Sequence, residues 1–142
     1  MNPDKSINKV IGFDYGKKRT GIASGQTITN TATPLITLTQ IEGNPDWKGI
    51  QQQIEQWQPD ALIIGIPYHL DGTESEMTKA ALHFRDSLKK RFGLPVYEVN
   101  EALSSYEAEE TLKKKSKISQ HNKHEVDKIA AAVIVQSWLD QH

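Results

Sequence analysis

Cysteine is absent from this 142-residue chain, and no apolar run approaches the roughly 18 residues that a membrane-spanning helix needs. Without cysteine the chain has no disulfides, no cysteine-ligated zinc site and no thiol catalysis. The first residues, Met1 to Lys5, lack the apolar stretch of a signal peptide. We therefore expect a cytoplasmic protein that does not associate with membranes.

An excess of charge of one sign is also absent, since the formal net charge is −1. The chain as a whole thus lacks the basic signature of many nucleic-acid-binding proteins. Nucleic-acid binding is still open, because local clustering of cations decides it rather than the total. The Walker-type phosphate loop, Gly-x-x-x-x-Gly-Lys-Thr, does not occur.

The residues that are present indicate one α/β domain over residues 1–142. Runs rich in Val, Ile, Leu and Thr predict strands over 9–14, 20–25, 31–38, 61–66 and 94–99. Short connections between the first three strands favour an antiparallel meander. The continuous apolar run at 61–66 is typical of a strand buried on both faces of a parallel sheet.

Helices complete the predicted order βββαβαβαα. Asn44 and Pro45 provide a capping and first-turn signal for one helix, and Thr73 with Glu76 forms a capping-box pattern for the next. Two further helices are predicted over 104–114 and 124–139. In the last helix we expect an inward face of Val126, Ile129, Ala130, Val133 and Ile134. Strands that alternate with helices after a meander predict a mixed sheet with helices on both faces.

Asp14 directly follows the apolar strand Val10–Phe13. Burial of a carboxylate is costly unless a cation or hydrogen-bond donors meet it. Three interpretations stay open on this segment: a metal site for phosphodiester cleavage, a phosphate loop of the actin and sugar-kinase type, or a hairpin turn in which Asp14 caps its own backbone. The kinase interpretation loses ground because such folds usually need two domains and this chain has room for one.

Two further acids lie where the fold could bring them to Asp14. Glu101 follows a predicted strand, and ligands of open α/β sheets gather at the carboxyl ends of strands. Asp127 lies in the first turn of the last helix, where it also favours the helix macrodipole whatever its function. Glu101 could likewise be an ordinary exposed acid before a helix. Three carboxylates without cysteine indicate a hard-cation site of the Mg²⁺ or Mn²⁺ type.

Basic residues cluster at two places although the net charge is near zero. Lys17, Lys18 and Arg19 lie in the turn beside Asp14. A second cluster precedes Asp127 and consists of Lys113, Lys114, Lys115, Lys117 and Lys123. These side chains could bind backbone phosphates of a nucleic acid, or they could be solvated cations at a helix end. Trp47 and Trp57 recur at helical spacing with isoleucines, which favours a core position over a base-stacking surface.

Four segments together carry a family resemblance. Gly12–Ala23 contains Gly-Phe-Asp-Tyr-Gly and Arg-Thr-Gly-Ile-Ala, Gly65–Thr73 contains Pro-x-x-x-Asp-Gly-Thr, and Asn100–Ser105 and Val126–Ala131 surround the other two acids. They resemble the YqgF family, also called RuvX, bacterial RNase H-like proteins named Holliday junction resolvases and later pre-16S rRNA nucleases. The resemblance covers about residues 9–139.

The resemblance implies an RNase H-like fold with a five-stranded mixed sheet of order 3-2-1-4-5. It also implies that Asp14, Glu101 and Asp127 form a catalytic, metal-binding triad. The leading hypothesis is then phosphodiester hydrolysis with two Mg²⁺ or Mn²⁺ ions about 3.5–4 Å apart. The preferred substrate is RNA at the 5′ end of pre-16S rRNA, and structured DNA such as a four-way junction is the alternative. We expect a monomer or a weak homodimer.

One segment departs from the family pattern. The family usually reads Asp-Glu-Arg where this chain has Asn100, Glu101 and Ala102. The metal-binding glutamate is kept, but a guanidinium that could hold a phosphate in a bidentate manner is lost. We expect Lys17, Arg19 or Lys123 to take over its role. The same departure keeps a third hypothesis open, a non-catalytic module that binds nucleic acid or a partner.

Overall fold

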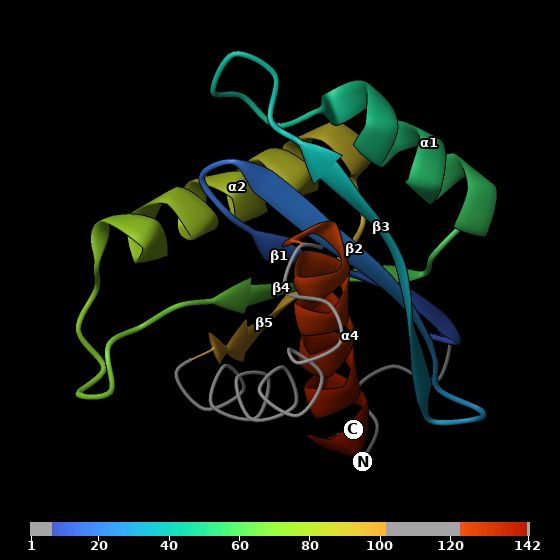
Figure 1. Ribbon diagram of the computed structural model, residues 1–142. Helices are drawn as coiled ribbons and strands as arrows, with labels where there is room; N and C mark the ends of the chain where they lie inside the picture. The colour runs from blue at the N-terminus through green and yellow to red at the C-terminus, as the bar shows by residue number, and fades with distance from the viewer. Residues whose placement is uncertain (1–6, 102–122, 142) are drawn as a thin grey trace.

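Five strands form one mixed sheet in the computed structural model, which describes residues 7–101 and 123–141 (Figure 1). The order across the sheet is β3-β2-β1-β4-β5, as predicted. The first three strands pair antiparallel, and β1, β4 and β5 run parallel. The strands span Lys9–Tyr15 (β1), Arg19–Gln26 (β2), Thr31–Thr39 (β3), Ala61–Ile66 (β4) and Val96–Asn100 (β5).

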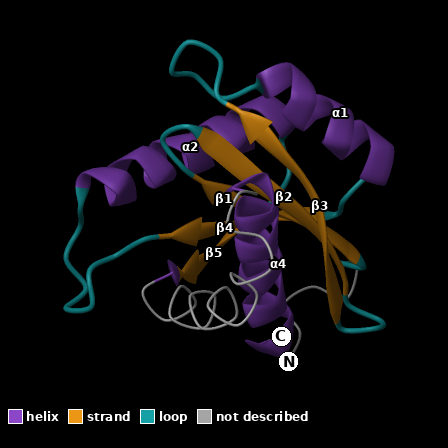
Figure 2. Cartoon of the chain, in the orientation of Figure 1, coloured by secondary structure: helices purple, strands orange, loops and turns teal. Residues whose placement is uncertain are grey.

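The described helices cover both faces of this sheet, which confirms the predicted architecture (Figure 2). α1 (Trp47–Trp57) and α2 (Glu76–Phe92) pack on one face, and α4 (Lys123–Gln141) packs on the other. The helix predicted over 104–114 lies outside the described residues. None of the helices in the described part of the chain is long and apolar enough to cross a membrane.

The sheet separates two apolar cores. Ile11 and Phe13 of β1 pack on the side of α1 and α2, whereas Val10 packs on the side of α4. Side chains alternate between the two faces of a strand. This alternation assigns Asp14 to the face that α4 covers and Tyr15 to the face of α1 and α2. All residues of β4 are buried, as predicted for a strand covered on both sides.

The predicted cap of α2 was wrong by two residues. Ser75 is the N-cap: its Oγ accepts a hydrogen bond from the Thr78 amide at 3.1 Å, and the Thr78 Oγ1 accepts one from the Ser75 amide at 2.9 Å. Thr73 instead donates its hydroxyl and amide protons to Asp71 Oδ1, at 2.7 and 3.0 Å. An aspartate two residues before Thr73 offers it a local turn, and this competes with a helix cap.

The predicted cap of α1 was also displaced. Asp46 is the N-cap, and its Oδ1 accepts a hydrogen bond from the Gly49 amide at 3.0 Å. The Asn44 backbone is instead paired with that of Ile41 in an isolated bridge. A carboxylate is among the preferred capping groups, and Asp46 adjoins the first helical residue. Both signals therefore located a helix start correctly to within a few residues.

The buried face of α4 differs from the predicted one. Its fully buried residues are Ala131, Ile134, Val135, Trp138 and Leu139. Of the residues predicted to face inward, Ile134 alone belongs to this set, and the others are partly buried. Because apolar residues surround much of the helix, the apolar pattern could not select one face.

Candidate active site

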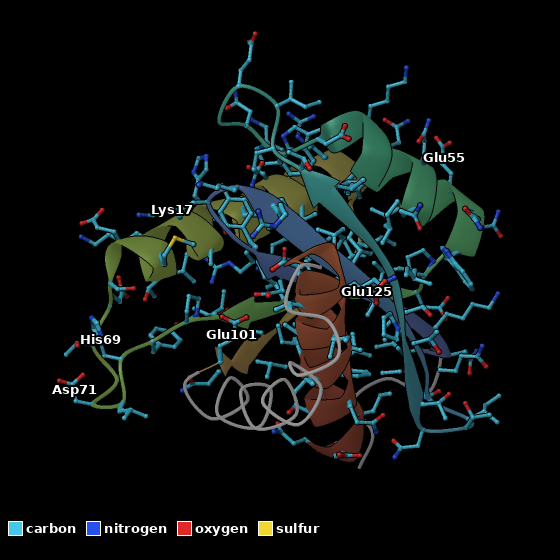
Figure 3. All side chains as sticks on the ribbon, in the orientation of Figure 1. Lys17, Glu55, His69, Asp71, Glu101 and Glu125 are labelled. Atoms are coloured by element: carbon cyan, nitrogen blue, oxygen red, sulfur yellow. The ribbon has the colours of Figure 1, made fainter. Side chains whose placement is uncertain are left out.

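Three parallel strands bring Asp14 and Glu101 to one edge of the sheet. Phe13 of β1 lies beside Ile64 of β4, so Asp14 lies level with Gly65. Gly65 pairs in turn with Val99 of β5, and Glu101 follows the end of β5. The carboxyl ends of β1, β4 and β5 therefore meet at this edge. Glu101 and Lys17, which follows β1, both lie toward it in Figure 3.

Gly65 leaves the space that Glu101 occupies. A Cβ atom at this position would lie 2.6 Å from Glu101 Oε1 and 2.5 Å from Ile134 Cδ1. Contacts this short would force the Glu101 side chain to move. The missing side chain of β4 thus allows Glu101 to reach across that strand to Asp14.

Asp14 and Glu101 share a side-chain hydrogen bond. Two carboxyl groups can do so only when one of them holds a proton. Burial raises the pKa of Glu101 to about 9, and the charge of Asp14 and the hydrogen bond to it act in the same direction. Burial also raises the pKa of Asp14, with a further increase from the charge of Asp127. At neutral pH Glu101 is therefore the protonated donor and Asp14 the acceptor.

Asp127 lies in the first turns of α4 and is held by Arg19. Arg19 Nε donates a hydrogen bond to Asp127 Oδ2 at 2.6 Å, and both side chains are partly buried. A charge-assisted bond of this length fixes the carboxylate of Asp127 firmly. Asp127 is close enough to Asp14 to raise its pKa, but its carboxylate is paired with the guanidinium.

Gly21 allows α4 to approach the sheet at Asp127. A Cβ atom on Gly21 would lie 2.0 Å from the backbone oxygen of Asp127 and 2.4 Å from its carbonyl carbon. Backbone atoms cannot yield as a flexible side chain can. The glycine of β2 therefore sets how close the third acid comes to the sheet.

The turn between β1 and β2 is fixed from β3. Gln40 donates from its side-chain nitrogen to the Gly16 carbonyl and from its amide to the Lys18 carbonyl, both at 2.8 Å. The Gly16 amide donates to the Arg19 carbonyl at 2.9 Å. Lys17 and Lys18 are exposed in this ordered turn. Sequence reasoning missed Gln40, since a lone glutamine after a strand carries no motif.

The predicted site residues are thus brought together unequally. Asp14 and Glu101 are in contact, and Asp127 adjoins them but is paired with Arg19. Within residues 7–101 and 123–141, no three His, Asp or Glu side chains converge as a ready-made metal site. Arg19, predicted in the turn and as a phosphate contact, is instead the first residue of β2 and an ion-pair partner. Four predicted lysines, and the side chain of Lys123, lie outside the described part: Lys113, Lys114, Lys115 and Lys117.

Comparison with known sequences gives one consistent result. The family model described as "RuvX: Holliday junction resolvase" matches residues 8–141. A protein of Legionella pneumophila (strain Paris) is 49% identical over 131 residues, which cover 92% of this chain and 94% of that protein. A protein of Nitrosococcus oceani is 47% identical over 132 residues, covering 93% and 86% of the two chains. Both relatives carry the name "Putative pre-16S rRNA nuclease".

Solved structures share the fold. RuvC of T. thermophilus in complex with a Holliday junction substrate superposes with a TM-score of 0.57 at 15% identity, covering 94% of each chain. The fowlpox virus Holliday junction resolvase gives a TM-score of 0.56 at 13% identity, covering 94% of this chain and 98% of that one. At such identities the likeness concerns the fold alone. The predicted RNase H-like fold is thereby confirmed.

Proposed function

Because this chain belongs to the RuvX family, we propose that it is a nuclease that hydrolyses phosphodiester bonds at the 5′ end of pre-16S rRNA. The name of its relatives supports the RNA substrate, and the extent of the match supports one nuclease domain over the whole chain. The single observation that carries the proposal is the contact between Asp14 and Glu101 at the carboxyl ends of β1 and β5. An rRNA substrate also implies a cytoplasmic protein.

We propose that Asp14, Glu101 and Asp127 hold the divalent cations of this nuclease, Mg²⁺ or Mn²⁺. The donor set fits, because it consists of carboxylate oxygens, which hard cations prefer. Asp14 and Glu101 retain a proton between them, and a cation would compete with that proton for the same oxygens. Such cations, when bound, lower the pKa of an attacking water and stabilise the leaving oxygen.

The other residues of the site have roles that need no protein nucleophile. Arg19 orients Asp127 through the 2.6 Å bond from its Nε. Lys17 and Lys18 are exposed in the turn that follows Asp14, where each could contact a backbone phosphate. Phosphate contacts position a strand and read little of its sequence.

A four-way DNA junction is the second candidate substrate. The description of the matched family, Holliday junction resolvase, favours it. Symmetric cleavage of a junction would be best served by a homodimer. An RNA-processing enzyme has no such requirement, so a monomer or a weak homodimer is compatible with the first candidate.

A cleavage assay with matched variants tests the proposal. Precursor 16S rRNA and a four-way DNA junction are incubated with the protein in millimolar Mg²⁺ or Mn²⁺, and the products are mapped. We expect RNA cleavage that Asp14→Asn abolishes and that Asp86→Asn, at an exposed aspartate of α2, leaves unchanged. The melting temperature of Asp14→Asn without metal should equal or exceed that of wild type, because like-charge crowding is relieved.

The same variants separate the remaining possibilities. Full cleavage by Asp14→Asn would remove the central claim. Cleavage of the junction but not of the RNA would favour the second candidate. Binding of either nucleic acid without any metal-dependent cleavage by wild type would favour a non-catalytic module. Equal stabilisation of wild type and the Asp14→Asn/Glu101→Gln/Asp127→Asn variant by the metal would show that the cation binds elsewhere.

A further inference from the structure

A second hollow lies on the opposite face of the sheet from the three acids. It has a volume of about 410 Å³ and lies between the end of β1, the loop before α1, and α2. Tyr15 contributes to its wall, and Tyr15 is the next residue after Asp14. Consecutive residues of a strand point to opposite faces. The end of β1 therefore presents the acids on one face and this pocket on the other.

Aromatic rings form one part of the pocket wall. The rings of Tyr15 and Phe84 are stacked with centroids 4.6 Å apart, and those of Trp47 and Phe84 are stacked at 5.3 Å. Phe84 is buried, whereas Tyr15 and Trp47 are only partly buried. Trp47 thus packs against the core, as predicted, and also lines the pocket. Flat apolar surfaces of this kind are suited to a planar aromatic ligand.

Polar and cationic groups form the rest of the wall. Asn44, His83, Ser87 and Arg91 line it, and none of its described lining residues is acidic. The guanidinium carbon of Arg91 lies 4.1 Å from the centroid of the Trp47 ring, which keeps the cation beside the aromatic wall. An aromatic wall next to a cation and hydrogen-bonding side chains matches a ligand that has a planar ring and a negative charge.

We propose that this pocket binds one nucleotide of the substrate strand, with the base against the aromatic wall and a phosphate near Arg91. This inference rests on the proposed function, which supplies the nucleic acid. The volume falls within the range of about 300–1,000 Å³ that is typical of small-ligand sites. A strand that passes over the end of β1 would place one phosphate at Asp14 and a flanking nucleotide in the pocket.

Two variants and their controls address the pocket directly. Ala80→Leu adds bulk to the wall and keeps a good helix former in α2; Lys79→Leu is its control, at an exposed neighbour outside the pocket. Arg91→Gln removes the cation, and Lys90→Gln removes an adjacent exposed cation that does not line the pocket. Circular dichroism and thermal melting of each variant establish that it is folded.

The test uses short single-stranded RNAs that carry one abasic nucleotide at successive positions. Binding is measured in EDTA, so that no strand is cut. We expect one abasic position to weaken binding about tenfold, as the loss of one stacked base does elsewhere. Ala80→Leu should weaken binding of the intact RNA by a similar factor. Applied together, the two changes should weaken it no more than either alone, because both remove the same contact.

A flat abasic profile, or abasic and Ala80→Leu effects that multiply, would overturn the inference. So would equal weakening by Arg91→Gln and Lys90→Gln, since this would reduce Arg91 to a general surface charge. A titration with uridine 5′-monophosphate, with uridine and with inorganic phosphate as controls, distinguishes a free nucleotide from a strand. Binding of the free nucleotide together with a flat abasic profile would also reject the substrate strand as the ligand.

Failure of the pocket and failure of the proposed function give different results. If the pocket inference fails, wild type still cleaves and Asp14→Asn still does not. If the nuclease proposal fails, no metal-dependent cleavage is seen, yet the abasic profile still reports whether the pocket holds a base. The two outcomes are read from separate assays on the same preparations.

Discussion

Replacement of Glu101 by glutamine should stabilise the metal-free protein, and the gain should grow as the pH rises. The reason is the proton that Glu101 holds. Its pKa is raised from the ordinary value of 4.5 to about 9 in the folded protein. Between these values the folded state binds more protons than the unfolded state, so the free energy of unfolding falls with rising pH. The stabilising contribution is complete below about 4.5 and is lost as the pH approaches 9.

The magnitude follows from the shift. One extra proton in the folded state lowers the free energy of unfolding by about 1.4 kcal/mol per pH unit. Between pH 5 and pH 8 the limit is therefore about 4 kcal/mol for this single group. Because Asp14 and Glu101 titrate as a pair, we expect roughly 1–3 kcal/mol of this dependence to disappear in Glu101→Gln. The glutamine amide can still donate a hydrogen bond to an ionised Asp14.

Urea denaturation of wild type and Glu101→Gln in EDTA, at several pH values, measures this difference. The two proteins should be similar near pH 5, and the variant should be more stable by pH 8. Glu55→Gln is the control, because Glu55 is an exposed residue of α1 far from the acids (Figure 3). A gap that stays constant with pH, or one that Glu55→Gln reproduces, would refute the reasoning.

Three further changes test other parts of the structure. Gly21→Ala should destabilise the protein by roughly 1–3 kcal/mol and impair cleavage by displacing Asp127, whereas Gly25→Ala, which meets side chains of the core, should destabilise without loss of cleavage; equal activities would contradict this. Ser75→Ala should cost about 1 kcal/mol in urea denaturation and Thr73→Ala clearly less. Four Lys→Gln changes should lower the log–log salt slope of RNA binding by about 0.7 per lost contact, and superimposable slopes would refute phosphate contacts there: Lys113, Lys114, Lys115 and Lys117.

The sheet could be predicted from the sequence because its strands differ in pattern. The apolar run Ala61–Ile66 can only be buried on both faces, and the structure places β4 between two cores. The short connections before Thr39 allow only antiparallel neighbours. Local signals thus decided the topology.

The faces and caps of the helices were harder to predict. α4 is apolar around much of its circumference, so the sheet selects Ala131, Val135 and Trp138 by shape. Ser75 prevailed over Thr73 because Asp71 offered Thr73 a competing hydrogen bond. In both cases several choices satisfied the local pattern, and contacts formed only in the folded chain decided between them.

The acids could be proposed from strand ends and a helix start, but their pairing could not. Nothing in the sequence indicates that Arg19 binds Asp127, which is 108 residues away along the chain. An arginine beside an acid-rich edge is equally suited to a phosphate, which is the role predicted for it. Only the approach of α4 to β2 decides which anion Arg19 meets in the protein without nucleic acid.

That approach depends on residues that have no functional group. Gly65 leaves the space through which Glu101 reaches Asp14, and Gly21 lets the backbone of Asp127 lie against β2. Each would carry a Cβ atom into the site if it were any other residue. Carboxylates repel one another, so they stay close only where the backbone holds them there. Both glycines belong to the segments that carry the family resemblance. The geometry of the acids therefore depends on two missing side chains as much as on the acids themselves.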